Sequence, residues 1–446
     1  MKRLFGTDGI RGIAGTAPLD PPGVRSFGVA LADVLAAEAG HRARVVVGRD
    51  TRESGPWLMQ AIADGLAARG AETIDAGVIT TPGLAYVARS VPFDAGVMIS
   101  ASHNPYRDNG LKVFSRDGFK LPDAIEMKIE ASVLDGGREA PPEGAGRPIP
   151  DGSLVRRYVA SLEGVVPAGR FASLSIVLDC ANGSATEIAP RVFRDLGARV
   201  TTRGDAPDGR NINLDCGSLH LDGLARVVRE GGHDIGLAFD GDADRCLAVD
   251  RTGRVVDGDH ILFVCGTRLK RERKLTGDAV VATIMSNFWL EKRFGELGIK
   301  LHRAQVGDKY VLEMMMAEGA ALGGEQSGHV IFRDRGTTGD GILTGLLLLD
   351  AALDGAEPLE TVLDGIVPYP QILINVPVAS KPDLRAHPAI GPVVEAAERD
   401  VAGRGRIVLR YSGTENLARV MVEADDDALV RGTAERIAAS IRDHLA

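Results

Sequence analysis

Three carboxylates, Asp240, Asp242 and Asp244, fall within five consecutive residues of the sequence. At a separation of about 5 Å and an effective dielectric constant of roughly 20, each pair would repel by about 3 kcal/mol. A divalent cation relieves this repulsion, and a carboxylate-rich site suits Mg²⁺ when a phosphate completes its coordination. An EF-hand begins with similar spacing, but Arg245 and Arg251 stand where that loop requires Gly and Glu. We therefore predict a magnesium site, with a solvated acidic turn as the alternative.

Ser102 follows an apolar segment, residues 96–99, and precedes Pro105, which cannot continue a strand. The end of a strand is where ligands bind in open α/β sheets. The Ser102 hydroxyl is therefore a candidate nucleophile, although Ser, Asn and Pro are also ordinary turn residues. Lys112 lies ten residues further along the chain. It is either a solvated surface group or a group that carries a proton beside the serine.

Two further loops suit a phosphorylated, polyhydroxylated ligand. Residues 410–414 read Arg-Tyr-Ser-Gly-Thr between two predicted strands. Their backbone N–H groups, two hydroxyls and guanidinium are what an anion needs, although a plain turn is the alternative. Arg419 is either a second anchor or a surface charge. Residues 324–329 read Gly-Glu-Gln-Ser-Gly-His and offer donors and acceptors for hydroxyl groups, although a single histidine such as His329 is more often structural than catalytic.

Cations elsewhere in the chain could lie near a bound phosphate. The candidates are Arg11, Arg49, Arg52 and Lys309. Each of them could equally be a surface charge, so the sequence alone assigns them no role.

These loops must be held by strands, and the strands recur in a repeated pattern. In each of three repeats, an apolar strand is followed by a loop, by a helix that ends near a glycine, and by a further strand. The opening strands of the three repeats are residues 44–47, 174–178 and 279–282. A later strand in each unit ends at the Ser102 loop, the three aspartates or residues 324–329. We therefore predict three related α/β domains whose strand ends face one cleft, with coincidental similarity of βαβ units as the alternative.

A smaller, differently built unit is predicted at the C-terminal end. Strands at about 406–410 and 417–423 flank the phosphate-binding loop, and Asp426 is the expected N-cap of a closing helix. Linkers are predicted near residues 136–152 and 354–370. The predicted domains are residues 1–150, 151–254, 255–368 and 369–446.

The composition argues against several classes of protein. A net charge of −9 and an aromatic content of 4% argue against a nucleic-acid-binding surface, which needs basic side chains and stacking rings. The four cysteines form no CxxC pair, which argues against a disulfide framework or a zinc site. The first residues lack the apolar run of a signal peptide, and the longest apolar stretch, residues 342–349, is too short to span a bilayer. We therefore expect a cytoplasmic protein that binds neither nucleic acid nor membrane.

Five segments together resemble the α-D-phosphohexomutase superfamily in order and spacing over essentially the whole chain. These segments are Phe5-Gly6-Thr7-Asp8-Gly9-Ile10-Arg11-Gly12, Ser100-Ala101-Ser102-His103-Asn104-Pro105, Asp240-Gly241-Asp242-Ala243-Asp244-Arg245, residues 324–329 and Ser412-Gly413-Thr414-Glu415. Gln326, residues 285–287 and residues 306–311 are similar to the phosphoglucosamine branch, whereas phosphomannomutases and phosphoglucomutases often carry Met at the position of Gln326. The sequence departs from many members at Tyr411 and Asn416, where they have Pro.

The resemblance implies an α/β fold of four domains around a central cleft, with three related mixed-sheet domains and a smaller α+β C-terminal domain. It implies that Ser102 is carried as phosphoserine and, together with Asp240, Asp242 and Asp244, holds one Mg²⁺. The implied proton-transfer and charge-stabilising residues are Arg11, Lys112 and His329. The implied substrate-binding residues are Arg245, then Glu325 and Ser327 on the sugar hydroxyls, and Arg410, Ser412, Gly413, Thr414 and Arg419 on the phosphate that is not transferred.

The activity implied by the resemblance is the interconversion of glucosamine 6-phosphate and glucosamine 1-phosphate, which feeds UDP-N-acetylglucosamine synthesis. Ser102 would pass its phosphate to a free sugar hydroxyl, and the resulting 1,6-bisphosphate would turn around and return its other phosphate. Glucosamine or glucose 1,6-bisphosphate would act as activator, and a homodimer is compatible with the resemblance. The alternatives are a mutase for mannose or glucose phosphates on the same fold, a phosphoserine-dependent sugar phosphatase, and a non-catalytic sugar-phosphate sensor.

Overall fold

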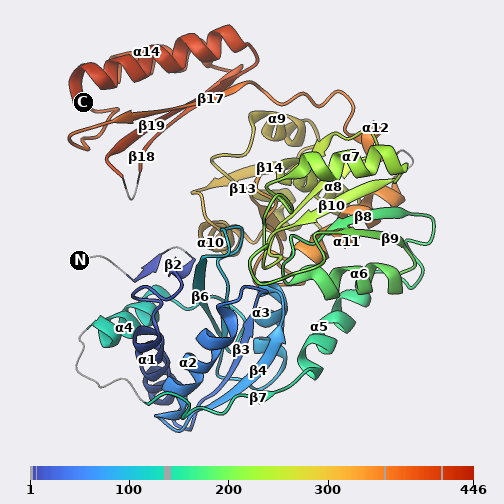
Figure 1. Cartoon of the computed structure of the whole chain (residues 1–446). Coiled ribbons are helices and arrows are strands. Elements are labelled where there is room, and N and C mark those ends of the chain that lie inside the picture. Colours follow the sequence, from blue (N-terminus) through green and yellow to red (C-terminus); the bar gives the residue numbers. More distant parts are fainter. Residues whose placement is uncertain (1–3, 7, 135–141, 356–357, 413–414, 446) are drawn as a thin grey trace.

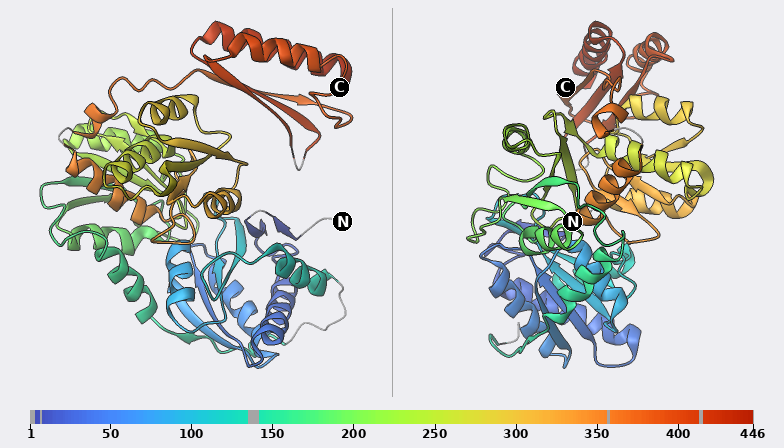
Figure 2. Two further views of the ribbon diagram at one scale, coloured as in Figure 1. Left: turned by 180° about the vertical axis from the view of Figure 1, so that it is seen from behind. Right: turned by 90° about the vertical axis from the view of Figure 1, so that its right-hand side faces the viewer.

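The computed structural model describes residues 4–6, 8–134, 142–355, 358–412 and 415–445. Four sheets of seven, five, four and three strands follow one another along this part of the chain. Figure 1 shows the first three units gathered together and the fourth, in red, joined to them by an extended segment. The views in Figure 2 show the same arrangement from behind and from the side. The predicted four-unit α/β architecture is therefore confirmed.

The first sheet has the strand order β1-β2-β6-β5-β3-β4-β7 and helices on both faces. Its strands are β1 (Phe5–Gly6), β2 (Gly9–Ile13), β3 (Arg44–Arg49), β4 (Glu72–Val78), β5 (Ala95–Ile99), β6 (Asp108–Ser115) and β7 (Ile149–Pro150). The accompanying helices are α1 (Pro21–Ala39), α2 (Gly55–Ala67), α3 (Thr81–Ser90), α4 (Asp123–Leu134) and α5 (Ser153–Glu163). Val45 and Val47 pack with α1, α2 and α4, whereas Val46 packs with α3 and α5. The continuous apolar run of β3 therefore reflects burial on both faces.

The second and third sheets share one hydrophobic core. Their orders are β12-β11-β10-β8-β9 and β14-β13-β15-β16. The strands are β8 (Ser175–Asp179), β9 (Arg199–Arg203), β10 (Ile235–Phe239), β11 (Cys246–Asp250), β12 (Val255–Val256), β13 (Ala279–Thr283), β14 (Lys300–Ala304), β15 (Leu322–Gly324) and β16 (Val330–Phe332). The helices are α6 (Ala185–Asp195), α7 (Leu221–Gly231), α8 (Gly258–Arg271), α9 (Phe288–Glu296), α10 (Asp308–Glu318), α11 (Gly341–Asp354) and α12 (Leu359–Val362). Helices α8 and α11 contact each other within this core, so the two sheets are not independent.

The three larger sheets repeat one arrangement of strands. In each, the opening strand (β3, β8 or β13) pairs in parallel with a strand on either side. One of those neighbours, β5, β10 or β15, then pairs antiparallel with the strand that follows it in the chain. The loops that contain Ser102, the three aspartates and Glu325 each leave that same strand. The equivalence that the sequence repeat predicted is therefore present in the topology.

The C-terminal unit is a small antiparallel sheet covered by two helices. Its order is β17 (Gln371–Pro377), β19 (Leu417–Ala424), β18 (Gly405–Tyr411), and its helices are α13 (Gly391–Val401) and α14 (Asp427–Leu445). Asp426 accepts a hydrogen bond of 2.7 Å from the N–H of Leu429, which confirms the predicted N-cap. Helix α13 was not predicted from the sequence, and α12 forms where a linker was predicted. No helix of the described chain is long and apolar enough to cross a membrane.

Candidate active site

Ser102 lies directly beyond β5 in a backbone conformation that few non-glycine residues adopt, with φ of 52°. Its N–H donates to the Ser100 hydroxyl over 3.0 Å. Its own hydroxyl donates to Oδ2 of Asp240 over 2.5 Å, and Nδ1 of His103 is 3.2 Å away on the other side. The predicted nucleophile and the first predicted metal ligand are therefore in direct contact across two domains.

The buried guanidinium of Arg52 holds the Ser102 loop in this shape. It donates to the carbonyl oxygens of Ser102 and Asn104 over 3.0 and 2.8 Å, and Asp50 pairs with it at 2.9 Å. Because this side chain is fully buried on backbone carbonyls, it is not a cation facing a phosphate, which was one role the sequence left open for it. Arg49 is also committed elsewhere, since it pairs with Asp75 at 2.8 Å.

Asp240, Asp242 and Asp244 bring one carboxylate oxygen each to within 4.8 Å of one another. Oδ1 of Asp242 and Oδ1 of Asp244 are buried and accept no hydrogen bond. Burial, followed by repulsion from Asp244 and Asp242, raises the pKa of Asp240 well above its ordinary value. Unpartnered carboxylate oxygens and mutual repulsion are what a bound divalent cation would correct. The residues present therefore fit Mg²⁺.

The Lys112 ammonium lies against the same aspartates. Its Nζ is 2.9 Å from Asp242, 3.2 Å from Asp244 and 3.1 Å from Asp8. Burial alone would lower the pKa of Lys112, but these three carboxylates hold it well above its ordinary value. Lys112 is thus a permanent buried positive charge, not the solvated surface group that was the alternative.

Asp8 connects several of the predicted cations and was not singled out from the sequence. It forms ion pairs with Arg11 and Lys120 as well as with Lys112. Burial alone would raise the pKa of Asp8, but Lys112, Lys120 and Arg11 hold it well below its ordinary value. Lys120 also pairs with Asp308 of the third domain at 2.5 Å. Asp8 therefore fixes Arg11 and Lys112 and links them to the opposite wall of the site.

His329 is buried beside the aspartates in a defined orientation. The N–H of Gly339 donates to Nε2 over 2.9 Å, so the ring proton is on Nδ1, which lies 3.6 Å from Oδ1 of Asp244. Burial alone would lower the pKa of His329, but Asp244 and then Asp308 raise it above its ordinary value. His329 therefore presents its Nδ1 proton toward Asp244, in a position where the ring could hold or exchange a proton beside the aspartates.

A cavity of about 420 Å³ opens onto these groups and is lined by residues of three domains. Of the predicted residues, Arg11, Asp244, Arg245, Glu325 and His329 line it. Nε of Arg11 and Nε of Arg245 are buried and donate no hydrogen bond, and Nε of Arg245 lies 3.9 Å from Oδ1 of Asp244.

Not every predicted site residue lines this cavity. Ser102 and Ser327 are not lining residues, although His103, which contacts Ser102, is one. Burial, then the positive charges of Arg245 and Arg11, lower the pKa of His103 to about 4, so this unpredicted neighbour of the nucleophile is neutral at physiological pH. The carboxylate of Glu325 accepts from the N–H of Gly307 over 3.0 Å.

The predicted phosphate-binding residues of the C-terminal unit lie apart from this cavity. Arg410 and Arg419 face each other as cross-strand partners on β18 and β19, and neither lines the cavity. Burial and the neighbouring Arg419 charge lower the pKa of Arg410, and Arg419 itself pairs with Glu415 at 3.4 Å. Ser412 accepts a hydrogen bond from the N–H of Glu415.

The remaining two predicted members of that loop, Gly413 and Thr414, lie outside the described residues. An unpredicted lysine, Lys381, donates to the carbonyl oxygens of Ser412 and Glu415 over 2.9 Å each. Lys381 therefore joins Ser412 and Glu415 within the C-terminal unit.

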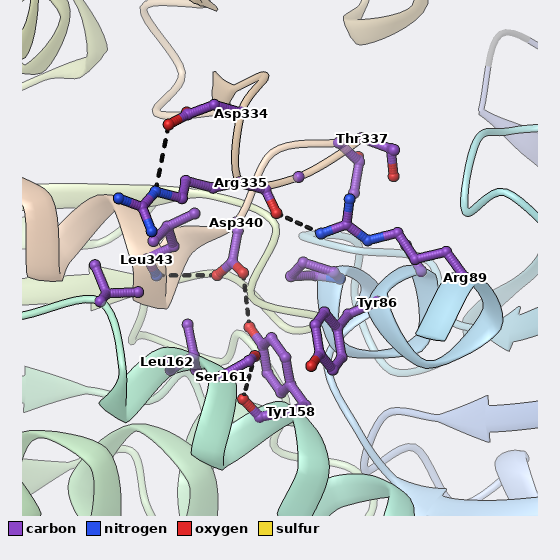
Figure 3. A pocket seen from close by; sticks show the side chains of 15 residues that line it. Tyr86, Arg89, Tyr158, Ser161, Leu162, Asp334, Arg335, Thr337, Asp340 and Leu343 are labelled. Atoms are coloured by element: carbon purple, nitrogen blue, oxygen red, sulfur yellow. Dashed lines mark hydrogen bonds and ion pairs between the residues drawn. The ribbon is translucent and has the colours of Figure 1, made fainter. Parts of the chain in front are cut away.

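A second cavity, of about 200 Å³, lies between α3, α5 and the segment before α11 (Figure 3). It shares no lining residue with the first cavity. The Tyr158 hydroxyl donates to Asp340 over 2.9 Å across it, and Arg89 donates to the carbonyl of Arg335. It is a junction between domains and contains none of the predicted site residues.

Comparison with known proteins assigns the whole chain to one family. Models of the four phosphoglucomutase/phosphomannomutase domains, I to IV, match residues 2–139, 156–253, 257–369 and 373–440. The chain is 49% identical to phosphoglucosamine mutase of Solibacter usitatus, over 99% of this chain and 98% of the relative. It is 46% identical to phosphoglucosamine mutase of Deinococcus radiodurans, over 98% and 97%.

Solved structures agree with this assignment. A phosphoglucomutase/phosphomannomutase family protein from Burkholderia thailandensis superposes with a TM-score of 0.80 and 26% identity, over 99% of this chain and 97% of that one. N-acetylphosphoglucosamine mutase of Aspergillus fumigatus, solved with GlcNAc-6P and magnesium, shares the fold with a TM-score of 0.67 and 21% identity, over 99% and 95%. The chain belongs to the phosphoglucomutase/phosphomannomutase family. It is accordingly a phosphosugar mutase, an isomerase.

Proposed function

We propose that this enzyme interconverts glucosamine 6-phosphate and glucosamine 1-phosphate through a phosphoserine at Ser102 and a 1,6-bisphosphate intermediate. The observation that carries the mechanism is the 2.5 Å contact between the Ser102 hydroxyl and Asp240, at the head of three clustered aspartates. The sugar is chosen on the full-length relatives named phosphoglucosamine mutase, which are 44–49% identical to the chain.

The charge of the site suits phosphoryl transfer. A phosphoserine carries about −1.5 to −2 charges at neutral pH, and phosphoryl transfer depends mainly on positioning and on neutralising charge. Asp240, Asp242 and Asp244 would hold Mg²⁺ together with the phosphate on Ser102, and bound Mg²⁺ would supply the largest neutralising charge. Lys112 supplies a further fixed ammonium, because three carboxylates keep it protonated.

Other residues bind the substrate and move its proton. Arg11 and Arg245 line the cavity, where their guanidinium groups would meet the anionic substrate. His329 carries a proton on Nδ1 and would stabilise charge or exchange a proton with the reacting hydroxyl. Glu325 and Ser327 would contact the sugar hydroxyls.

The C-terminal unit would bind the phosphate that stays on the sugar. Arg410 and Arg419 form a pair of neighbouring guanidinium groups that a dianion would bridge. Ser412, Gly413 and Thr414 would contact the same phosphate. Because the cavity contains no residue of this unit among the described residues, the unit would have to approach when the substrate is bound. A movable anchor also suits an intermediate that must turn around between two transfers.

The domain boundaries in this proposal are residues 1–150, 151–254, 255–368 and 369–446. The first and last of these boundaries fall between sheets, whereas β12 (Val255–Val256) of the second sheet lies just beyond residue 254. A cytoplasmic location stays a prediction from the sequence, which is compatible with a homodimer but does not assign the oligomeric state.

The substrate is tested by turnover with Mg²⁺ and a trace of glucose 1,6-bisphosphate, on glucosamine, glucose and mannose monophosphates. We expect the highest kcat/KM with glucosamine phosphates. A preference for glucose or mannose phosphates would keep the mechanism and overturn the sugar. Steady release of inorganic phosphate without isomerisation would favour the sugar phosphatase instead.

A further inference from the structure

The two oxygens of Asp242 have different surroundings. Oδ2 accepts hydrogen bonds from the Thr81 hydroxyl over 2.5 Å and from Lys112 over 2.9 Å. Oδ1 is buried and accepts none. The carboxylate is therefore fixed with one oxygen occupied and the other open, as a ligand that offers one oxygen to a cation would be.

Thr81 is held rigidly where it meets Asp242. It is completely buried at the first position of α3, and the preceding Thr80 caps that helix by accepting from the N–H of Gly83 over 3.0 Å. The N–H of Thr81 donates to the carbonyl of Asp242 over 2.9 Å. Because the side chain is completely buried and the backbone N–H is tied to Asp242, the hydroxyl is kept beside that carboxylate.

Lys112 alone would hold Asp242 less specifically. Its single ammonium is shared among Asp8, Asp242 and Asp244, and its flexible stem permits small displacements. The Thr81 hydroxyl contacts one carboxylate oxygen only and adds no charge that would compete with a cation. Partners of this kind fix the orientation of metal ligands, and their loss typically weakens metal binding roughly 10- to 100-fold.

We propose that Thr81 is a positioning residue for the divalent cation. Its hydroxyl, which belongs to the domain that carries Ser102, orients Asp242 of the next domain so that Oδ1 faces the metal. This inference rests on the metal site of the proposed function. It assigns Thr81 no contact with the substrate.

The test measures Mn²⁺ affinity directly, by the electron paramagnetic resonance signal of free Mn²⁺ titrated with purified, unphosphorylated enzyme. The variants are Thr81→Val, which removes the hydroxyl and keeps the shape, Thr81→Ser, which keeps the hydroxyl, and Thr81→Ala as a second removal. Thr344→Val is the matched control, because Thr344 is also fully buried in a helix but its hydroxyl has no hydrogen-bond partner. Asp242→Asn is titrated alongside them.

We expect Thr81→Val and Thr81→Ala to raise the Mn²⁺ dissociation constant by roughly tenfold or more, while Thr81→Ser and Thr344→Val stay within about threefold of the wild type. Two results would overturn the role of Thr81 while leaving the metal site intact, as long as Asp242→Asn binds Mn²⁺ weakly. One is that Thr81→Val binds Mn²⁺ as tightly as the wild type. The other is that Thr81→Ser loses as much Mn²⁺ affinity as Thr81→Val. If Asp242→Asn binds Mn²⁺ as tightly as the wild type, the metal site itself is wrong, and the inference falls with it.

Discussion

The Ser102 hydroxyl and the Asp240 carboxylate lie 2.5 Å apart although 138 residues separate them in the chain. Each follows the equivalent strand of its own sheet, β5 or β10. The contact places a serine that would carry a phosphate against the carboxylates that would hold its counter-cation. Repetition of one strand arrangement is thus what assembles this site from separate domains.

Ser102→Ala should abolish nearly all turnover without unfolding the protein. The substitution removes the proposed phosphate carrier, and the loop remains held through its backbone by Arg52. Turnover and thermal unfolding are measured on the same preparation. Turnover near that of the wild type would exclude Ser102 as the carrier.

Asp242→Asn should raise the Mg²⁺ concentration needed for half-maximal turnover. The amide replaces one of three clustered carboxylates and lowers the negative charge that attracts the cation. A magnesium titration of the rate, at saturating phosphosugar, provides the measurement. An unchanged titration would count against the aspartates as the metal site.

Lys112→Gln should destabilise the enzyme most strongly when no divalent cation is present. Removing the buried ammonium leaves Asp8, Asp242 and Asp244 uncompensated, and breaking a buried ion pair costs roughly 3–5 kcal/mol. Unfolding temperatures are compared with EDTA and with Mg²⁺, which should restore part of the loss by replacing the positive charge. A loss of the same size in both buffers would contradict this account.

Arg410→Ala should raise KM for the phosphosugar by roughly tenfold or more, since a charge-assisted contact to phosphate is worth about 1.5–3 kcal/mol. The control is Arg404→Ala, because Arg404 lies just before the same strand but is an exposed residue paired with Asp425. We expect the control to keep the KM of the wild type. Equal KM values for both variants would remove the C-terminal loop from the substrate site.

Asp340 gives a prediction about pH and stability at the domain junction of Figure 3. Burial raises its pKa from 3.8 to about 6, so the folded state binds a proton more tightly than the unfolded state. Stability should therefore fall as the pH rises from about 4 to about 6, by roughly 3 kcal/mol at about 1.4 kcal/mol per pKa unit.

Asp340→Asn tests that prediction, because Asn also caps helices and can accept from Tyr158, yet it does not titrate. The unfolding temperature of Asp340→Asn minus that of the wild type should be larger at pH 7.5 than at pH 4.5. A difference that does not vary with pH would show that Asp340 has an ordinary pKa in the folded protein.

Local sequence patterns were sufficient to predict the loops that carry chemistry. Asp240, Asp242 and Asp244 lie within five consecutive residues, and Ser102 stands where an apolar run stops. The residue types and the spacing are therefore visible without the fold. The repeat of strand, loop and helix likewise predicted three related sheets, because alternating βαβ units leave a periodic apolar pattern.

The residues that hold these loops could not be found in the same way. Thr81 lies 161 residues from Asp242, and Arg52 lies 50 residues from Ser102, so nothing in the local sequence marks them as partners. Asp8 stands in a segment that carries part of the family resemblance, but Arg11 was the residue of that segment given a role. Buried partners of this kind are determined by tertiary packing within and between domains, which single-sequence periodicity does not contain.

The most direct test of the central claim follows one phosphate through Ser102. The enzyme is incubated with glucose 1,6-bisphosphate labelled in its phosphates and then desalted. One portion is digested and mapped by peptide mass spectrometry, and the other portion is mixed with glucosamine 6-phosphate. The account predicts label on Ser102 alone and its transfer to the glucosamine phosphate within one turnover. Label on another residue, or label that leaves Ser102 only as inorganic phosphate, would contradict it.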